Sequence, residues 1–150
     1  MKRFVAFLFI LAVFALIPLG MTRFSADTDE VTRVTFVTES PIEMEGAEVI
    51  ASGVDYYITV PVAQIEETQS KLKNIKGYVC YYDKSVEQNK INSLMQYKLS
   101  ETIIENTRVL TGYTSLYKDY RIIDGKKVNI QVVFTESEVI VGYPLILTGF

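Results

Sequence analysis

The sequence has no histidine, no tryptophan and only one cysteine, Cys80. Catalysis through a Ser-His-Asp or Cys-His arrangement needs an imidazole base, and His-ligated zinc sites need imidazole donors, so both classes are excluded. A single cysteine forms neither an internal disulfide nor a thiolate cluster. We therefore expect a fold that is held together by packing, with no metal and no cofactor.

Basic residues are scarce outside the N-terminus. Lys2, Arg3 and Arg23 are three of the 15 basic residues, which leaves 12 basic against 18 acidic residues and a net charge of −6 for the rest of the chain. Proteins that bind nucleic acid neutralise phosphates with Lys and Arg. The acidic balance predicts that nucleic acid is not a partner.

Polar residues are missing from one long run near the N-terminus. Residues 1–24 open with two basic residues and continue from Phe4 to Met21 without a charge, which is the layout of an export signal. The run is longer than a typical signal core of roughly 7–15 residues. It is slightly shorter than the roughly 20 residues that span a bilayer. A cleaved signal peptide and an uncleaved signal anchor therefore both stay open.

The possible cleavage sites do not decide between these alternatives. Cleavage needs small residues at positions −1 and −3, whereas a site after Ala26 has Phe24 at −3 and one after Gly20 has Pro18 there. The basic start keeps the N-terminus cytoplasmic. We expect an extracytoplasmic protein, either secreted or held at the cytoplasmic membrane by residues 4–21. The expected organisation is a signal segment at 1–24, a polar tether at 25–30 and a single domain at 31–150.

Apolar periodicity predicts the elements of this domain. Recurrence at intervals of three and four predicts helices over Val62–Asn74 and from about Ser85 to Glu105. Alternation predicts strands, and Asp124-Gly125 between two apolar runs favours a type I′ hairpin turn. The pattern indicates an α+β fold, an antiparallel-rich sheet with two helices on one face and a C-terminal β-meander. The expected strands are Arg33–Glu39, 47–52, Val54–Pro61, Tyr78–Asp83, one within 107–117, and three between Tyr120 and Tyr143.

The C-terminal third carries motifs of a known family. Gly112-Tyr113-Thr114, the run Gly125–Gln131 and the run Gly142–Ile146 resemble the last strands of the YwmB family, exported proteins of Gram-positive, spore-forming bacteria. The resemblance covers about forty residues, and its motifs are structural. It implies a sheet with helices on one side, as in TATA-box-binding proteins. The resemblance does not indicate an activity, because similarity of fold alone does not imply a shared function.

Carboxylates and Cys80 are the remaining candidates for catalysis. A glycosidase-type reaction needs two carboxyl groups held across a cleft, but glutamates in turns and on helix faces mostly solubilise a protein. Alternation places Cys80 opposite Val79 and Tyr81 on its strand, which is typical of a buried small residue. The candidate acid pairs are Glu43 with Glu45, Glu66 with Glu67, and Glu136 with Glu138.

Tyrosines and a group of basic residues are the candidates for an interaction surface. In each of the pairs Tyr56-Tyr57 and Tyr81-Tyr82 one ring must point away from the core, and exposed rings suit protein contact. Basic residues around the hairpin could contact anionic lipid or wall polymer, or could protect a sheet edge from pairing. The candidate surface comprises Tyr57, Tyr82, Tyr117, Tyr120, Arg121, Lys126 and Lys127.

These observations favour an extracytoplasmic domain without enzymatic activity that contacts a protein or another component of the envelope. Two alternatives stay open. One is an envelope hydrolase that uses carboxylates alone, and the other is a carrier that shelters a lipid or small ligand between helices and sheet.

Overall fold

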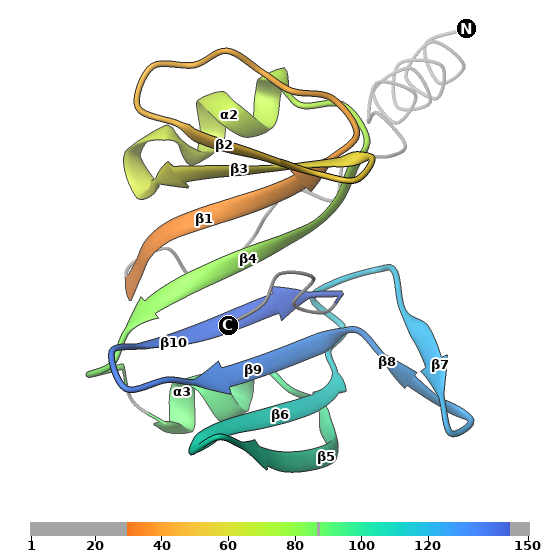
Figure 1. Ribbon diagram of the computed structural model, residues 1–150. Helices are drawn as coiled ribbons and strands as arrows, with labels where there is room; N and C mark the ends of the chain where they lie inside the picture. The colour runs from red at the N-terminus through yellow and green to blue at the C-terminus, as the bar shows by residue number, and fades with distance from the viewer. Residues whose placement is uncertain (1–29, 87, 145–150) are drawn as a thin grey trace, which may run out of the picture.

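An antiparallel sheet of eight strands forms the body of the domain (Figure 1). The computed structural model describes residues 30–86 and 88–144. The strand order is β2-β3-β1-β4-β10-β9-β6-β5, so each half of the chain contributes adjacent strands, and β7 and β8 form a separate pair. In chain order the elements are β1 (Val31–Thr38), β2 (Glu48–Ser52), β3 (Asp55–Pro61), the 3-10 helix η2 (Val62–Gln64), α2 (Ile65–Lys71), β4 (Ile75–Asp83), α3 (Gln88–Ser93), β5 (Tyr97–Ile104), β6 (Thr107–Tyr113), β7 (Arg121–Ile123), β8 (Lys126–Val128), β9 (Ile130–Phe134) and β10 (Glu138–Tyr143).

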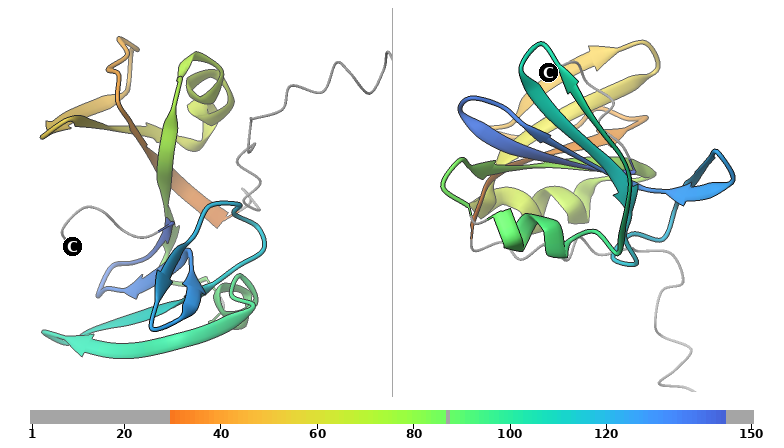
Figure 2. Two further views of the ribbon diagram at one scale, coloured as in Figure 1. Left: turned by 90° about the vertical axis from the view of Figure 1, so that its right-hand side faces the viewer. Right: turned by 90° about the horizontal axis from the view of Figure 1, so that it is seen from below.

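Both α-helices cover the same face of the sheet (Figure 2). Ile65 of α2 and Ile91 of α3 belong to one buried cluster with Phe36, Ile58 and Val132 of the strands. Burial of these side chains removes apolar surface from water, which is the main force that holds a helix on a sheet. The predicted α+β class, with two helices on one face, is confirmed.

Alternation along the strands separates the two faces. In β4, Cys80 is fully buried on the helix-covered face, whereas Val79 and Tyr81 belong to a second apolar cluster on the opposite face, as predicted. We call this opposite side the helix-free face. Its cluster has four buried members, Val79, Val109, Val133 and Ile140.

The second predicted helix, from about Ser85 to Glu105, is wrong over most of its length. α3 covers only Gln88–Ser93, and β5 follows at Tyr97–Ile104. Leu99 and Ile103 repeat at a helical interval, but β5 is rich in Thr, Ile and Tyr, which suit strands. Its pairing with β6 decides its conformation.

The Asp124-Gly125 turn is confirmed. Asp124 has φ 49° and Gly125 has φ 73°, the two positive angles that a type I′ turn requires. The chain changes direction at Asn129, between β8 and β9. The meander in the sheet therefore runs through β6, β9 and β10, while β7 and β8 project from it as a hairpin (Figure 1). We call residues 115–128 the arm.

Among the described residues, no helix is long and apolar enough to cross a bilayer. The signal segment expected at 1–24 lies outside the described residues, as does the tether expected at 25–30 except for Glu30.

Candidate interaction surface

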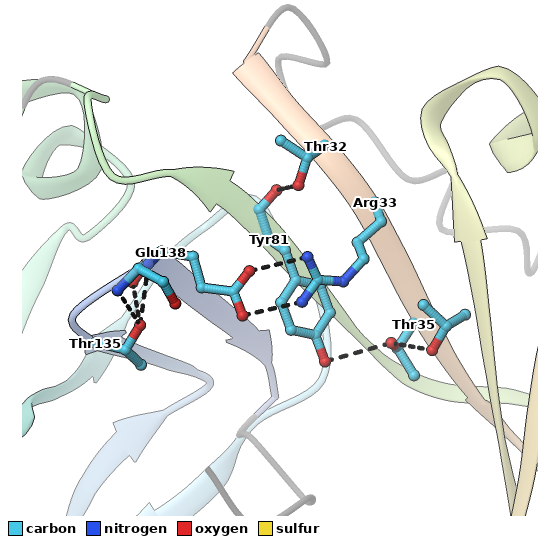
Figure 3. A network of polar contacts seen from close by, with 8 residues as sticks. Thr32, Arg33, Thr35, Tyr81, Thr135 and Glu138 are labelled. Atoms are coloured by element: carbon cyan, nitrogen blue, oxygen red, sulfur yellow. Dashed lines mark hydrogen bonds and ion pairs between the residues drawn. The ribbon is translucent and has the colours of Figure 1, made fainter.

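A polar contact on the helix-free face joins the two halves of the sheet (Figure 3). The guanidinium of Arg33 pairs with the carboxylate of Glu138 through two bonds, Nη1 to Oε2 and Nη2 to Oε1, each 2.9 Å long. Its central carbon lies 3.9 Å from the centroid of the Tyr81 ring. Because these residues come from β1, β10 and β4, charge-assisted and cation–π contacts fasten three central strands together.

The acid pairs that the sequence offered for catalysis lie at or near the surface. Glu138 is bound by Arg33 through both carboxylate oxygens. Glu67 accepts a 2.6 Å bond from Lys71 one turn away on α2. The other candidates are exposed: Glu43, Glu45, Glu66 and Glu136.

Two other acids have lowered pKa values. A hydrogen bond from Arg108, followed by one from Lys98, lowers the pKa of Glu101 to about 2. Bonds from the hydroxyl and backbone N–H of Ser85 lower the pKa of Asp83. A general acid needs the opposite shift. These two carboxylates are therefore suited to ion pairing and turn formation rather than to proton donation.

A hollow of about 300 Å³ opens beside Asp83. One oxygen of Asp83 accepts bonds of 2.8 and 2.6 Å from Ser85, and Glu30 pairs with Lys90 at 3.1 Å. Within the described residues, no group of three or more His, Cys, Asp or Glu side chains could hold a metal ion. The hollow is lined by Glu30, Val31, Thr32, Asp83, Ser85 and Val86.

Burial makes Cys80 unreactive. Its side chain is 0 % exposed, and removal from water raises the pKa of the thiol well above its ordinary value. Because the thiolate is the nucleophile, a buried thiol of this kind does not react readily. Cys80 is a core residue.

The structure corrects part of the tyrosine prediction. Tyr57 is partly exposed on the helix-free face, as expected, but Tyr82 is only 3 % exposed and lies in the core under the helices. Tyr81 is the member of its pair on the helix-free face. Alternation in the sequence already indicated that Tyr82 is buried, because Tyr82 lies on the same side of β4 as the buried Cys80.

Asn129 fixes the base of the arm. Its amide nitrogen donates to the carbonyl oxygens of Thr114 at 2.9 Å and Tyr117 at 2.8 Å, and its amide oxygen accepts from the Thr114 backbone at 2.7 Å. The residue is 0 % exposed. Buried polar groups are costly without partners, so the three bonds hold both ends of the arm at one point. We call Thr114, Tyr117 and Asn129 the root.

Tyr117 anchors the root in the core, which corrects its predicted place on the surface. The side chain is 4 % exposed, and its ring lies 5.6 Å from that of Tyr78 and 6.0 Å from that of Tyr143. Its hydroxyl donates to the carbonyl oxygen of Lys76 at 3.3 Å. Burial, and then the charge of Asp119, raises the pKa of Tyr117 to about 12.

Residues 120–127, the tip of the arm, are all exposed. They include four residues of the predicted surface, Tyr120, Arg121, Lys126 and Lys127. The ammonium of Lys127 lies 4.3 Å from the centroid of the Tyr120 ring. The hydroxyl of Tyr97 donates to the backbone carbonyl of Lys127, which ties the tip to the start of β5.

The exposed large apolar side chains of the described residues gather in three places. Two are the edges of the sheet, formed by β2 with its turn and by β5, and the third is the arm. Exposed apolar groups that gather in this way mark contact surfaces. They are Val49, Ile50 and Val54 at the first edge, Tyr97, Ile103 and Ile104 at the second, and Leu116, Tyr120, Ile122 and Ile123 on the arm.

Comparison of the chain with protein-family models, with curated proteins and with solved structures finds no match. The resemblance to the YwmB family remains a proposal that rests on the C-terminal motifs.

Proposed function

We propose that this chain is an extracytoplasmic domain that acts by contact with a protein or envelope component and not by catalysis. In this proposal residues 1–24 direct export, and the domain is either released or held at the membrane by residues 4–21. The resemblance to exported YwmB proteins is consistent with this location.

The distribution of exposed apolar side chains carries the proposal. They lie on the two sheet edges and the arm, where Val54 is 79 % and Ile103 is 72 % exposed. Edge strands present unpaired backbone groups that can bind an added strand, and apolar side chains beside them add contact area. Among the described residues, the acids offered as catalytic pairs are bound in ion pairs or exposed, and the two acids that line the hollow, Glu30 and Asp83, are bound by Lys90 and Ser85. The surface therefore favours binding over acid–base chemistry.

The location is tested by labelling Val54→Cys in intact cells with a maleimide that does not cross membranes. Cys80 is buried and supplies little background. We expect labelling of Val54→Cys before lysis, and sequencing of the recovered N-terminus distinguishes release from anchoring. Labelling that occurs only after lysis would contradict an extracytoplasmic location.

Contact through the edges is tested with a photo-crosslinking residue at Ile103 of β5 and, as a control, at Glu66 of α2. Both positions are exposed, but Glu66 lies on a charged helix surface. We expect adducts in cells from Ile103 and not from Glu66. Equal yields at the two positions, or none at Ile103, would count against a dedicated contact surface.

A further inference from the structure

The arm combines exposed apolar side chains with four basic residues. Its cations are Lys118, Arg121, Lys126 and Lys127, and its acids are Asp119 and Asp124, which leaves a net charge of +2. The chain after the signal segment has a net charge of −6, so the arm is opposite in sign to the domain that carries it. An anionic partner is therefore attracted to the arm and repelled elsewhere.

Pairing within the hairpin places apolar and basic groups side by side. Ile122 lies opposite Lys127, and Ile123 lies opposite Lys126. Because residues that face each other across two strands share one side, each side of the hairpin carries an isoleucine next to a lysine. Ile122 is 61 % exposed and Ile123 38 %. The side of the hairpin with Ile122, Lys127 and the Tyr120 ring is thus the side more exposed to solvent.

The arm is held in place before any partner binds. Asn129 ties its two ends together, Tyr117 is buried in the core, and Tyr97 bonds the backbone at Lys127. A surface that is already ordered loses less conformational entropy on binding. The hairpin of β7 and β8 projects from the sheet (Figure 1). These contacts therefore present Ile122 and the adjacent cations in a preformed arrangement.

We propose that the tip of the arm binds the surface of a bilayer that contains anionic phospholipid, with Ile122 and Tyr120 at the acyl boundary and Arg121, Lys126 and Lys127 among the phosphates. This proposal rests on the extracytoplasmic contact function proposed above and names its partner. Aliphatic and aromatic groups flanked by Lys and Arg are the composition of interfacial membrane segments. A soluble anionic polymer would use the cations but leave Ile122 and Ile123 in water.

The topology places the arm and the start of the domain at opposite ends of the sheet. β1 begins beside the β9–β10 turn, because Val31 pairs with Tyr82 and Tyr82 with Val139. The arm joins β9 at Ile130, the other end of that strand. Glu30 and the arm therefore lie at opposite ends of the strands.

The test uses the full chain with a fluorophore that responds to polarity, attached at Ile122→Cys. The control is the same label at Val54→Cys, an exposed site on the far edge of the sheet. Vesicles contain phosphatidylcholine with or without phosphatidylglycerol. Vesicles without phosphatidylglycerol control for insertion of residues 4–21, which would bring the label close to either bilayer. We expect a blue shift, and quenching by lipid-borne nitroxide, at position 122 with phosphatidylglycerol only.

Charge variants sharpen this test. Arg121→Gln with Lys126→Gln should reduce the equilibrium constant for contact of the labelled arm with the vesicle about fivefold for each charge. Lys71→Gln with Lys73→Gln, which removes two charges from the region of α2, should leave this constant unchanged. Asp124→Asn should increase contact, because Asn also tolerates positive φ and removes a repelled carboxylate.

Three outcomes would overturn the proposal. They are an equal shift with and without phosphatidylglycerol, no shift with either vesicle, and a shift at position 122 with soluble polyphosphate in the absence of lipid. Labelling of Val54→Cys in intact cells tests the location separately. The proposal of membrane contact by the arm can therefore be refuted while the proposed extracytoplasmic location is upheld.

Discussion

The root and the tip of the arm are close in sequence, but the root is buried and the tip is exposed to solvent. Asn129 and Tyr117 are 0 % and 4 % exposed, whereas Ile122 is 61 % exposed. Polar groups of the root bond within the domain, while apolar groups of the tip face outward. A buried polar residue next to exposed apolar ones reverses the usual distribution. The difference indicates that the root supplies stability and the tip supplies contact.

The largest expected difference in unfolding free energy is between alanine variants of two tyrosines, Tyr117 in the root and Tyr120 at the tip. Tyr117→Ala removes a ring packed against Tyr78 and Tyr143 and should lower the free energy of unfolding by about 3–5 kcal/mol. Tyr120→Ala at the exposed tip should change it by less than about 0.5 kcal/mol. Chemical denaturation of both variants measures the contrast, and similar losses for the two would remove the distinction between root and tip.

A second contrast concerns asparagine. Asn129→Leu leaves the backbone groups of Thr114 and Tyr117 buried without their partner, and should cost about 3 kcal/mol in unfolding free energy. Asn89→Leu on the exposed side of α3 is the control and should stay within about 0.5 kcal/mol of the parent. Should Asn129→Leu unfold like the control, the three hydrogen bonds would not support the arm.

Gly112, near the root, lies in close contact with the backbone of β5. A Cβ at this position would lie 2.3 Å from the carbonyl oxygen of Tyr97, a backbone atom, and 3.1 Å from Sδ of Met95. Gly112→Ala must therefore displace β5, at a cost of about 1–3 kcal/mol in unfolding free energy. Thermal unfolding measures this effect, and an unchanged midpoint would mean that β5 moves without penalty.

Alkaline pH should weaken the root. Burial raises the pKa of Tyr117 to about 12, above its ordinary value near 10. The stability linked to this group is complete below pH 10 and is lost as the pH rises through 12. Tyr117→Phe should therefore lose less stability between pH 10 and pH 12 than the parent, as measured by denaturation at each pH. A Tyr117→Phe variant with the same pH dependence as the parent would refute this assignment.

Local patterns predicted much of the fold. Alternation located β1, β3 and β4, the Asp124-Gly125 pair defined the hairpin turn, and the helical period of the segment after Pro61 found α2. These features depend on residues close together in the chain, so a single sequence carries the information.

What the sequence did not predict depends on distant contacts. β5 became a strand because β6 pairs with it, against a misleading helical spacing. Simple alternation would place Asn129 on the outward side with Lys127 and Gln131, but a change of direction between β8 and β9 buries it. No local rule identifies its partners at Thr114 and Tyr117.

The separation of root and tip is tested most directly by replacing Ile122 and Ile123 with Ser in a full chain labelled at Tyr120→Cys, an exposed position within the tip. The measurement is the fluorescence shift of the label on phosphatidylglycerol vesicles, with unfolding followed in the same samples. We predict that the double variant keeps the parent's unfolding free energy within about 0.5 kcal/mol and loses the shift. A shift of parental size, with or without a loss of stability, would contradict a role of the tip in membrane contact.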